Sequence, residues 1–538
     1  MRAQYLLSVA LAALWATSAQ ALVQISTAAT QNMNCSAGVC TPTAANAVLN
    51  TTDLTTMLST ADVKVATGNG AVTIAVMSPF SWASTHRLTL DANVTVSFRA
   101  AVQVAGQGAV TIVTNDGGGT TGDLIFFPNS KLDFSDTGSS LIINGNTYAL
   151  VGNVATLASD ITSNPSGFYA LAQDYDATPD GQYDGAPIAT NFFGGFDGLG
   201  HAISNLSMRS DDDLGLSLGL FAQSSGTIRN TNLVNANVSV TSSVVGGLTI
   251  GSLVGDNVGI IKYSSATNGT VTETNSADGT FGGLVGTNGG QIISSSAAMT
   301  VTGVYAGGLA GDNRSLITDS FAAGTVKGQA AAGGIVAVNY DEIFLSHTSG
   351  AVSAKRPAGD AGHSFIGGLA GWNLGGKISQ SYSTGQNSGV SHVVLGGLVG
   401  WNTGGTVTQS YTLGTTQASK GGNIGGVIGT GDMSSKVTQV YSAGPTSGGS
   451  SKAILGGVIG RDRSKAGNIS TAYWDLSTTG IADPQKGAGD PLNALGITGL
   501  TDAQLKSGLP TGFDPAVWAI KKKINNGYPY LIANHPPQ

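Results

Sequence analysis

A short glycine-rich segment recurs through the second half of this 538-residue chain and constrains its fold more than any other feature. Each copy reads Gly-(Gly/Ser)-apolar-apolar-small, and successive copies start 25 to 34 residues apart. One copy holds two or three short strands and cannot bury its apolar residues alone, so we expect the copies to stack and to bury the same positions against one another. The copies start at Gly251, Gly282, Gly307, Gly333, Gly367, Gly396, Gly425 and Gly456, and a degenerate copy starts near Leu218.

Two other positions recur within the copies. Six residues after the start, most copies have an asparagine, and stacked asparagine side chains can hydrogen-bond along the axis as a ladder. The glycines suit sharp turns with positive φ. Further on, a β-branched residue is followed by an aromatic one, and His347 holds the aromatic position in its copy, which favours packing over chemistry. The asparagines are Asn257, Asn288, Asn313, Asn339, Asn373 and Asn402.

The composition agrees with a stack of short strands. Glycine accounts for 79 residues, charged residues for only 10% and hydrophobic residues for 41%. Small turn residues between short β-branched runs are what many-stranded proteins need. The net charge of −7 and the lack of a basic stripe in the sequence argue against a nucleic-acid partner. We therefore predict an all-β protein in which the repeats form a solenoid.

The repeats resemble the GLUG motif, named for sequences such as Gly283-Leu284-Val285-Gly286 and Gly397-Leu398-Val399-Gly400. The run Tyr473-Trp474-Asp475 near the C-terminus is similar to the usual ending of that family. The short strands of 63–150 resemble coils of filamentous-haemagglutinin-like exoproteins. This resemblance implies a right-handed parallel β-helix in a bacterial surface or secreted protein, often an adhesin.

We expect six segments along the chain. Residues 1–21 combine Arg2, an apolar run and the small-x-small sequence Ala19-Gln20-Ala21, which is typical of a removed secretory signal peptide. No later segment reaches the ~18 unbroken apolar residues of a transmembrane helix. The remaining segments are a short, irregular N-terminal cap region over 22–62 with one helix over 53–61, β-strand coils over 63–150, a junction over 151–217, the repeat array over 218–483 and a C-terminal capping segment over 484–538.

Two cysteines, Cys35 and Cys40, lie near the expected mature N-terminus. In an exported protein they are expected to pair as a disulfide that closes a small loop.

Four groups of residues are candidates for catalysis or for nucleotide binding. Ser217 lies in a Gly-x-Ser-x-Gly match, but no helix pattern follows it, as a nucleophile elbow requires. Gly371 to Lys377 resembles a phosphate-binding loop but lacks the Ser or Thr that holds Mg²⁺. The acidic groups 211–213 and 341–342 could act as paired carboxylates of a polysaccharide-cleaving enzyme, although solvated turns are the simpler interpretation.

Asp174, Asp176, Asp180 and Asp184 form the densest group of oxygen ligands in the sequence. Calcium prefers such carboxylates, and the spacing follows part of an EF-hand loop. Pro187 stands where the closing glutamate should be, so turns stabilised by Asp side chains are the favoured interpretation and calcium the alternative. No cofactor is expected.

Trp372 and Trp401 occupy the same position in neighbouring repeats, and we expect them to stack at one corner of the rod. A packed corner is the favoured interpretation of this pair. Because tryptophan is flat and amphipathic, the pair is the alternative candidate for a ligand-binding site. The leading hypothesis is a secreted or surface-exposed, non-catalytic adhesin-like protein that binds a glycan or protein on a host or neighbouring cell. The alternatives are a polysaccharide-acting enzyme on the same fold and a purely structural matrix component.

Overall fold

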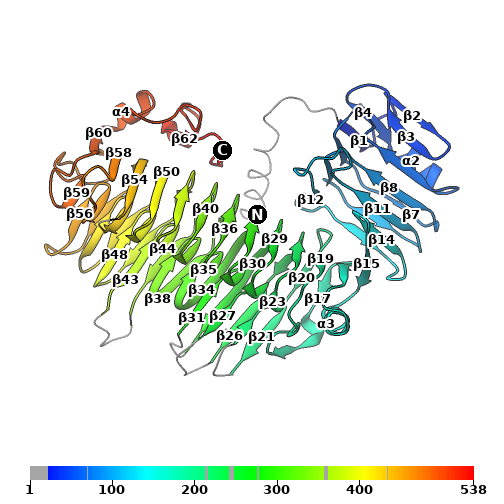
Figure 1. Cartoon of the computed structure of the whole chain (residues 1–538), viewed down its shortest axis with the longest axis horizontal. Helices are drawn as coiled ribbons and strands as arrows, with labels where there is room; N and C mark the ends of the chain where they lie inside the picture. The colour runs from blue at the N-terminus through cyan, green and yellow to red at the C-terminus, as the bar shows by residue number, and fades with distance from the viewer. Residues whose placement is uncertain are drawn as a thin grey trace.

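The computed structural model describes residues 22–68, 71–211, 216–241, 247–274, 278–356, 362–432 and 434–537. The expected signal segment 1–21 lies outside the described residues. The predicted all-β, parallel β-helix is confirmed: short strands stack in parallel to form a solenoid of about 15 turns (Figure 1). Within the described ranges, the helices are all too short or too polar to cross a membrane.

The N-terminal coils, residues 22–150, follow directly from period-two alternation in the sequence. Val63, Leu88, Val110 and Leu141 are register partners on neighbouring strands and are all buried, so each strand adds one apolar rung to the same core. The first sheet contains β4 (Ala47–Asn50), β1 (Leu22–Ser26), β6 (Thr73–Val76), β9 (Thr95–Phe98) and β12 (Leu124–Phe126). The second contains β7 (Phe80–Trp82), β10 (Val102–Val104) and β13 (Leu132–Phe134), and a third row contains β3 (Val39–Pro42), β5 (Val63–Ala66), β8 (Arg87–Asp91), β11 (Ala109–Val113) and β14 (Ser140–Ile143).

The segment expected to be an irregular cap, 22–62, already supplies strands β1, β3 and β4 to this stack. Its one helix, α2 (Thr51–Leu58), starts two residues earlier than expected because Asn50 caps it by accepting from two backbone amides. The predicted disulfide is present and joins Cys35 to Cys40 across the antiparallel hairpin of β2 (Met33–Ser36) and β3. The hairpin and helix therefore close the first coil.

The segment 151–217, expected to be a junction, starts a second hydrophobic core. After β15 (Asn146–Val151), helix α3 (Val154–Ser163) packs Val154, Leu157 and Ile161 onto the new core. The chain then forms coils whose strands stack in parallel, namely β16 (Phe168–Leu171) on β19 (Gly195–Asp197), β17 (Tyr175–Asp176) on β20 (Ala202–Ser204) and β18 (Gln182–Asp184) on β21 (Ser207–Ser210).

In the array, one sequence repeat forms one coil. The repeat starts Gly333, Gly367, Gly396 and Gly425 are successive register partners. Length differences between repeats are taken up by the loops between strands. The strand rows that flank the glycine corner are β22 (Ser217–Leu218), β27 (Leu248–Ile250), β31 (Gly279–Gly282), β34 (Ser296–Gly307), β38 (Thr325–Gly333), β43 (Ser364–Gly367), β48 (Val393–Gly396), β52 (Gly422–Gly425) and β56 (Ile454–Gly456) on one side. On the other side lie β23 (Phe221–Ser224), β28 (Val254–Asn257), β32 (Val285–Asn288), β35 (Ala310–Asn313), β39 (Val336–Asn339), β44 (Ala370–Leu374), β49 (Val399–Thr403), β53 (Ile428–Gly431), β57 (Ile459–Asp462) and β59 (Ala488–Asp490).

Three further rows complete each coil. The row after the asparagines contains β24 (Thr227–Arg229), β29 (Ile260–Lys262), β33 (Gln291–Ile293), β36 (Leu316–Thr318), β40 (Glu342–Phe344), β45 (Lys377–Ser379), β50 (Thr406–Thr412), β54 (Lys436–Ser442) and β58 (Ile469–Asp475). The next row contains β25 (Asn232–Val234), β30 (Ser265–Glu273), β37 (Phe321–Ala322), β41 (His347–Thr348), β46 (Tyr382–Ser383) and β60 (Ile497–Leu500). The last contains β26 (Asn237–Val240), β42 (Ala351–Ala354), β47 (Asn387–Gly389), β51 (Thr416–Ala418) and β55 (Thr446–Gly448).

The glycines that start each repeat are required because other backbone atoms approach their Cα atoms closely. The expectation that these glycines adopt positive φ is wrong. A Cβ on Gly396 would lie 1.9 Å from the Val399 carbonyl oxygen, and one on Gly397 would lie 2.0 Å from the Gly426 oxygen. The left-handed turn of each coil instead lies between the row that starts with β24 and the row that starts with β25. It is made by non-glycine residues, namely Tyr263, Ser294, Asp319, Leu345, Gln380, Gln409, Gln439 and Thr471.

A serine follows most of these turns and compensates for the strained backbone. The amide of Ser295 donates to the Ser320 hydroxyl at 3.1 Å, and the amide of Ser320 donates to the Ser346 hydroxyl at 3.2 Å. Each of these hydroxyls donates in turn to the carbonyl two residues earlier. The serine thus satisfies buried backbone groups that a left-handed turn would otherwise leave unpaired.

The predicted asparagine ladder is confirmed. From Asn257 to Asn402, the side-chain amide of each of the first five asparagines donates to the side-chain oxygen of the next at 2.8–2.9 Å, and all six side chains are fully buried. Because each amide supplies one donor and one acceptor along the axis, the ladder extends with every added coil.

An aromatic ladder runs along another face of the rod. Its rings stack with centroids 4.8–5.3 Å apart. His347 lies within it between Phe321 and Tyr382, so the prediction that it packs is confirmed, and burial lowers its pKa to about 4. The members are Phe321, His347, Tyr382, Tyr411 and Tyr441.

Residues 501–537, here called the C-terminal strap, cover this ladder. The strap begins with helix α4 (Asp502–Ser507) and runs back along the rod through β61 (Trp518–Ala519) and β62 (Tyr530–Leu531) (Figure 1). The Tyr441 hydroxyl donates to the Pro529 carbonyl at 2.6 Å, and the Asn534 amide donates to the Gln380 carbonyl at 2.9 Å. The C-terminal segment therefore covers a side of the rod as well as its end.

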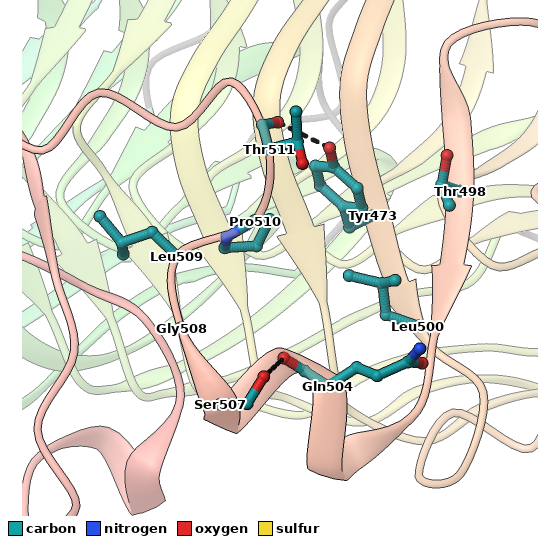
Figure 2. Close-up of a pocket in the computed structure, with 9 residues that line it drawn as sticks. All are labelled: Tyr473, Thr498, Leu500, Gln504, Ser507, Gly508, Leu509, Pro510 and Thr511. Atoms are coloured by element: carbon teal, nitrogen blue, oxygen red, sulfur yellow. Dashed lines mark hydrogen bonds between the residues drawn. The ribbon is translucent and has the colours of Figure 1, made fainter.

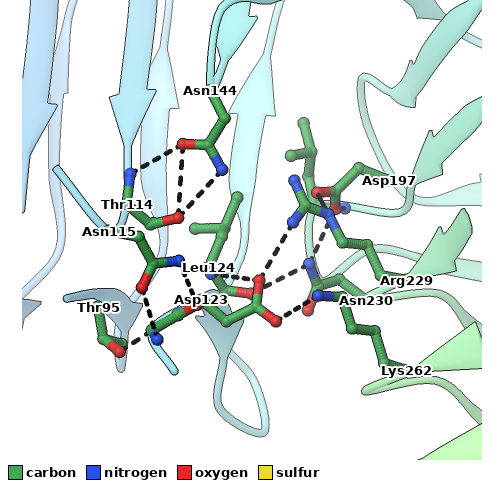
Figure 3. A network of polar contacts seen from close by, with 12 residues as sticks. Thr95, Thr114, Asn115, Asp123, Leu124, Asn144, Asp197, Arg229, Asn230 and Lys262 are labelled. Atoms are coloured by element: carbon green, nitrogen blue, oxygen red, sulfur yellow. Dashed lines mark hydrogen bonds and ion pairs between the residues drawn. The ribbon is translucent and has the colours of Figure 1, made fainter. Parts of the chain in front are cut away.

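The N-terminal coils are tied sideways to the array by buried charges (Figure 3). Arg229 donates to Asp197 at 2.7 Å and pairs with Asp123 of the N-terminal coils at 3.2 Å. Lys262 also pairs with Asp123. Asp197 is fully buried and accepts from Asn230 as well. This network fixes the loop before β12 against the first coils of the array.

Candidate functional site

Two rows of outward-pointing side chains face each other across the glycine corner. On one side, register partners follow the sequence Thr249, Thr280, Tyr305, Ala331 and Phe365. On the other, they follow Asp256, Thr287, Asp312, Val338, Trp372 and Trp401. The hydroxyls of Thr280 and Thr287 lie 3.0 Å apart across the corner. The two rows thus flank one corner of the rod, here called the corner groove.

The floor of the corner groove is glycine backbone. A Cβ on Gly286 would lie 2.3 Å from the Ile250 amide, and one on Gly311 would lie 2.5 Å from the Phe281 amide. These two stretches of backbone therefore touch, and no side chain separates them at the floor of the corner.

The groove widens into a hollow of about 270 Å³ where the residues become aromatic. Trp372 lines one end, Tyr305 and Tyr340 line the sides, and Val338 is the small residue between them. Tyr340 is 42% exposed. Three aromatic rings around an open hollow provide the flat apolar surfaces that sugar rings and other planar groups pack against.

Trp372 and Trp401 stack as expected, with ring centroids 5.3 Å apart and planes within 7°. Phe365 packs against both rings. This stacking hides the facing sides of the two indoles, so Trp372 alone contributes to the lining of the hollow. Its indole nitrogen donates to Thr403 at 2.8 Å, which holds the ring in place. Of the candidate pair, only Trp372 is therefore available to a ligand in the hollow, and Trp401 supports it from behind by stacking.

The opposite end of the hollow is polar. Asp312 is 3% exposed; one of its oxygens accepts from Arg314 at 3.0 Å, and within the described ranges the other has no hydrogen-bond partner. Burial raises the pKa of Asp312 despite the nearby guanidinium, and burial likewise raises the pKa of Asp256 two coils away. Arg314 also lies over the Tyr340 ring, 5.6 Å from its centroid. The lining of the hollow therefore combines a buried carboxylate, which has one unpaired oxygen, with the exposed guanidinium of Arg314.

The four aspartates considered for calcium do not converge. Asp174 pairs with Lys131 at 2.9 Å, Asp176 accepts from Thr178 and Asn205, and Asp180 accepts from the hydroxyls of Tyr175 and Tyr183. No group of three or more His, Cys, Asp or Glu side chains in the described ranges could hold a metal ion. Asp184 lies at the end of β18. These carboxylates stabilise turns and coil contacts.

The other candidates also have ordinary partners. Ser217 lies in β22, and its hydroxyl meets Thr249 at 2.8 Å, as part of the row that flanks the groove. Asp211 pairs with Arg209 at 2.6 Å, whereas residues 212 and 213 lie outside the described residues. Glu342 pairs with Lys377 at 2.8 Å, and its neighbour Asp341 is exposed. Of these candidates that the structure describes, none is among the residues that line the hollow containing Trp372.

Sequence reasoning missed Tyr305, Asp312, Arg314 and Tyr340 as one site. The signal was present in the repeat register. The position directly before the first repeat glycine is buried, and the one before that points outward, as does the position before each ladder asparagine. Aligning the repeats and comparing the residue two before the first glycine with the residue before the ladder asparagine would have identified both rows of the groove.

No protein-family model matches the chain. The chain is similar to Halomucin from Haloquadratum walsbyi, with 30% identity over 265 residues that make up 46% of this chain, and it spans 3% of the length of Halomucin. Among solved structures it is similar to a candidate immunoglobulin A1 protease from Bacteroides ovatus. That likeness has a TM-score of 0.32 and 18% identity, and it covers 72% of this chain and 92% of the other.

Proposed function

We propose that this protein is an exported, adhesin-like β-solenoid of the GLUG type that binds carbohydrate in the aromatic hollow of the corner groove. The observation that carries the proposal is the placement of Trp372, Tyr305 and Tyr340 around one open hollow with a polar end. Aromatic faces bind the apolar side of a pyranose ring, while Asp312 and Arg314 supply an acceptor and donors for its hydroxyl groups.

Two features support export. The cysteines are paired in a disulfide, and disulfides persist mainly in oxidising compartments outside the cytosol. The sequence of 1–21 is typical of a secretory signal. A rod that repeats one coil many times also suits a surface role, because it presents long, regular faces to a partner.

The test is binding of the purified protein to a panel of bacterial, plant and host oligosaccharides, measured by calorimetry. We expect Trp372→Ala to weaken binding at least tenfold because the end of the hollow is lost. Trp401→Phe is the matched control, since Trp401 is not among the residues that line the hollow, and it should bind as the unchanged protein does. Equal weakening by both variants, or no binding by any glycan, would contradict the proposal, and the latter would favour a purely structural matrix role.

A second candidate function is cleavage of a polysaccharide, and one observation favours it. Asp256 and Asp312 point outward from one row, two coils apart, which corresponds to about 10 Å along the rod. Inverting glycosidases place their two carboxyl groups about 6.5–9.5 Å apart and need one of them to have a raised pKa, and burial raises the pKa of both here.

Reducing-end release from polysaccharides distinguishes the two functions. Cleavage that disappears in both Asp256→Asn and Asp312→Asn, but persists in Glu342→Gln, would establish an enzyme. Binding without release, at high protein concentration, would leave the adhesin-like role.

A further inference from the structure

A second hollow lies at the C-terminal end of the aromatic ladder, on a different row of strands from the corner groove. It has a volume of about 400 Å³ and lies between β58, β60 and the first residues of the C-terminal strap (Figure 2). Figure 2 shows the residues that line it, among them Tyr473, Thr498, Gln504 and Pro510.

The register explains why this hollow exists. Tyr411, Tyr441 and Tyr473 occupy the same position in successive coils, and the next register partner is Thr498. A ring is therefore replaced by a small side chain at the last rung. Tyr473 does not continue the stack but packs edge-on against Phe513, with centroids 5.7 Å apart. The space beside the Tyr473 ring that a further aromatic residue would fill remains open.

The polar groups around this hollow are uncharged. The Tyr473 hydroxyl donates to the Thr511 carbonyl at 2.7 Å, which fixes the ring (Figure 2). Gln504 uses its carbonyl oxygen to cap α4 at Thr501, so its amide nitrogen faces outward as a donor. Thr498 and Ser507 add hydroxyls, and Leu500, Leu509 and Pro510 add apolar contacts.

We infer that this hollow binds one neutral pyranose ring, stacked beside Tyr473 at the vacant rung of the ladder. A sugar ring has an apolar face for Tyr473 and Pro510, and hydroxyl groups for Thr498, Gln504 and Ser507. The Ser507 hydroxyl already donates to the Gln504 backbone carbonyl at 2.8 Å and can still accept from a sugar. A purely aromatic occupant would give the Thr498 hydroxyl and the Gln504 amide no partner, which costs free energy. The site is independent of the groove at Trp372 and does not rest on the function proposed for it.

The test uses ligand-observed NMR of the full chain with methyl β-D-glucopyranoside as the probe, and with benzyl alcohol as an aromatic comparison. Thr498→Tyr supplies the missing ring, so it should reduce binding of the sugar at least tenfold. Because Thr498 is exposed on β60, the variant should fold, and filling the vacant rung should raise the thermal midpoint. Thr498→Ser, which keeps the hydroxyl and the space, should bind as the unchanged protein does.

Trp372→Ala should leave this binding unchanged, which separates the site from the corner groove. Sugar binding that survives Thr498→Tyr, or that is lost in Trp372→Ala, would overturn the inference. So would binding of benzyl alcohol without the sugar, or no binding of either probe.

Discussion

The N-terminal coils and the repeat array have the same parallel architecture but are stabilised in different ways. In the N-terminal coils, rungs of Val, Leu and Ile supply most of the order, and polar contacts between coils are local, such as Thr114 with Asn144. In the array, three ladders each place one side chain per coil at a fixed corner, namely asparagine, serine and aromatic residues. Alternation alone is therefore enough to stack coils, and ladders add a fixed register at each corner.

The ladders also determine which positions of the array can form a binding site. Ladder positions are buried and fixed by their neighbours, whereas the positions beside them point outward and vary freely from coil to coil. The corner groove uses two such rows, so Tyr305 and Trp372 are held in register by ladders that they do not belong to. The array thus combines a rigid frame with a variable surface.

The largest expected effect concerns the joint between the two regions. Arg229→Met leaves Asp197 buried without its cation, and breaking a buried pair in this way costs about 3–5 kcal/mol. Denaturation by guanidinium should show the loss. The double variant Arg229→Met with Asp197→Leu should recover most of it, because no uncompensated charge remains. A single variant that costs less than about 1 kcal/mol would mean that the regions do not depend on this pair.

The same Gly→Ala change should have unequal effects in the two regions. In the array, a Cβ on Gly396 would lie 1.9 Å from the Val399 oxygen, so strain of about 3 kcal/mol or more is expected. In the N-terminal coils, Gly145 has φ of 82° and open space around its Cβ position, so only the backbone cost of about 1 kcal/mol applies. Equal shifts in the unfolding midpoint would contradict the role of close approach in the array.

An asparagine substitution compares a ladder with a local contact. Asn339→Ala interrupts two amide bonds at 2.8 Å and leaves Asn313 and Asn373 with buried unpaired groups, at an expected cost of about 2–3 kcal/mol. Asn144→Gly tolerates the positive φ of 49° at this position, removes a partly buried bond to Thr114 and should cost about 1 kcal/mol. Hydrogen exchange should show lost protection spreading to both neighbouring coils only for Asn339→Ala. Loss confined to one coil would argue against a cooperative ladder.

The smallest effect is a pH dependence of opposite sign in the two regions. Burial raises the pKa of Asp319, at the left-handed turn of the array, to about 6. Its contribution to stability is full below the unfolded pKa near 3.8 and is lost as pH rises through about 6. Asp319→Asn should therefore stabilise the protein at pH 7.5, by on the order of 2 kcal/mol, and should have no effect near pH 3.5.

Asp136 in the N-terminal coils gives the matched comparison. Hydrogen bonds from the Gly138 amide and from Gln107 lower its pKa, so its contribution is present above pH 3.8 and is lost as pH falls further. Asp136→Asn should slightly destabilise the protein at pH 7.5. Thermal midpoints of both variants across pH 3.5–8 check the signs, and equal signs would be inconsistent with burial as the cause at Asp319.

Much of the solenoid could be predicted from the sequence, because the residues of each ladder recur at nearly regular spacing along the chain. The spacing of Asn257 to Asn402 gave the asparagine ladder, and the aromatic position gave the packing of His347. The strap over the aromatic ladder could not be predicted, since Tyr441 and Pro529 are 88 residues apart and the strap follows no repeat. The repeat glycines were attributed to positive φ, whereas close backbone contact requires them. Both conditions favour glycine, so the sequence could not distinguish them.

The candidate site was predicted only in part. Trp372 and Trp401 were expected to stack and do so, but stacking also removes one of them from the hollow. The other members, such as Tyr305 and Asp312, come from different coils with no local motif, and only the observed register brings them together.

The most direct test of the account is a crystal structure of the protein with an oligosaccharide selected from the binding panel. We predict a sugar ring against the free face of Trp372, near Tyr305 and Tyr340, with a hydroxyl group accepting from the exposed guanidinium of Arg314. An occupied ligand elsewhere on the rod, with this hollow empty, would contradict the central claim that the corner groove is the carbohydrate-binding site.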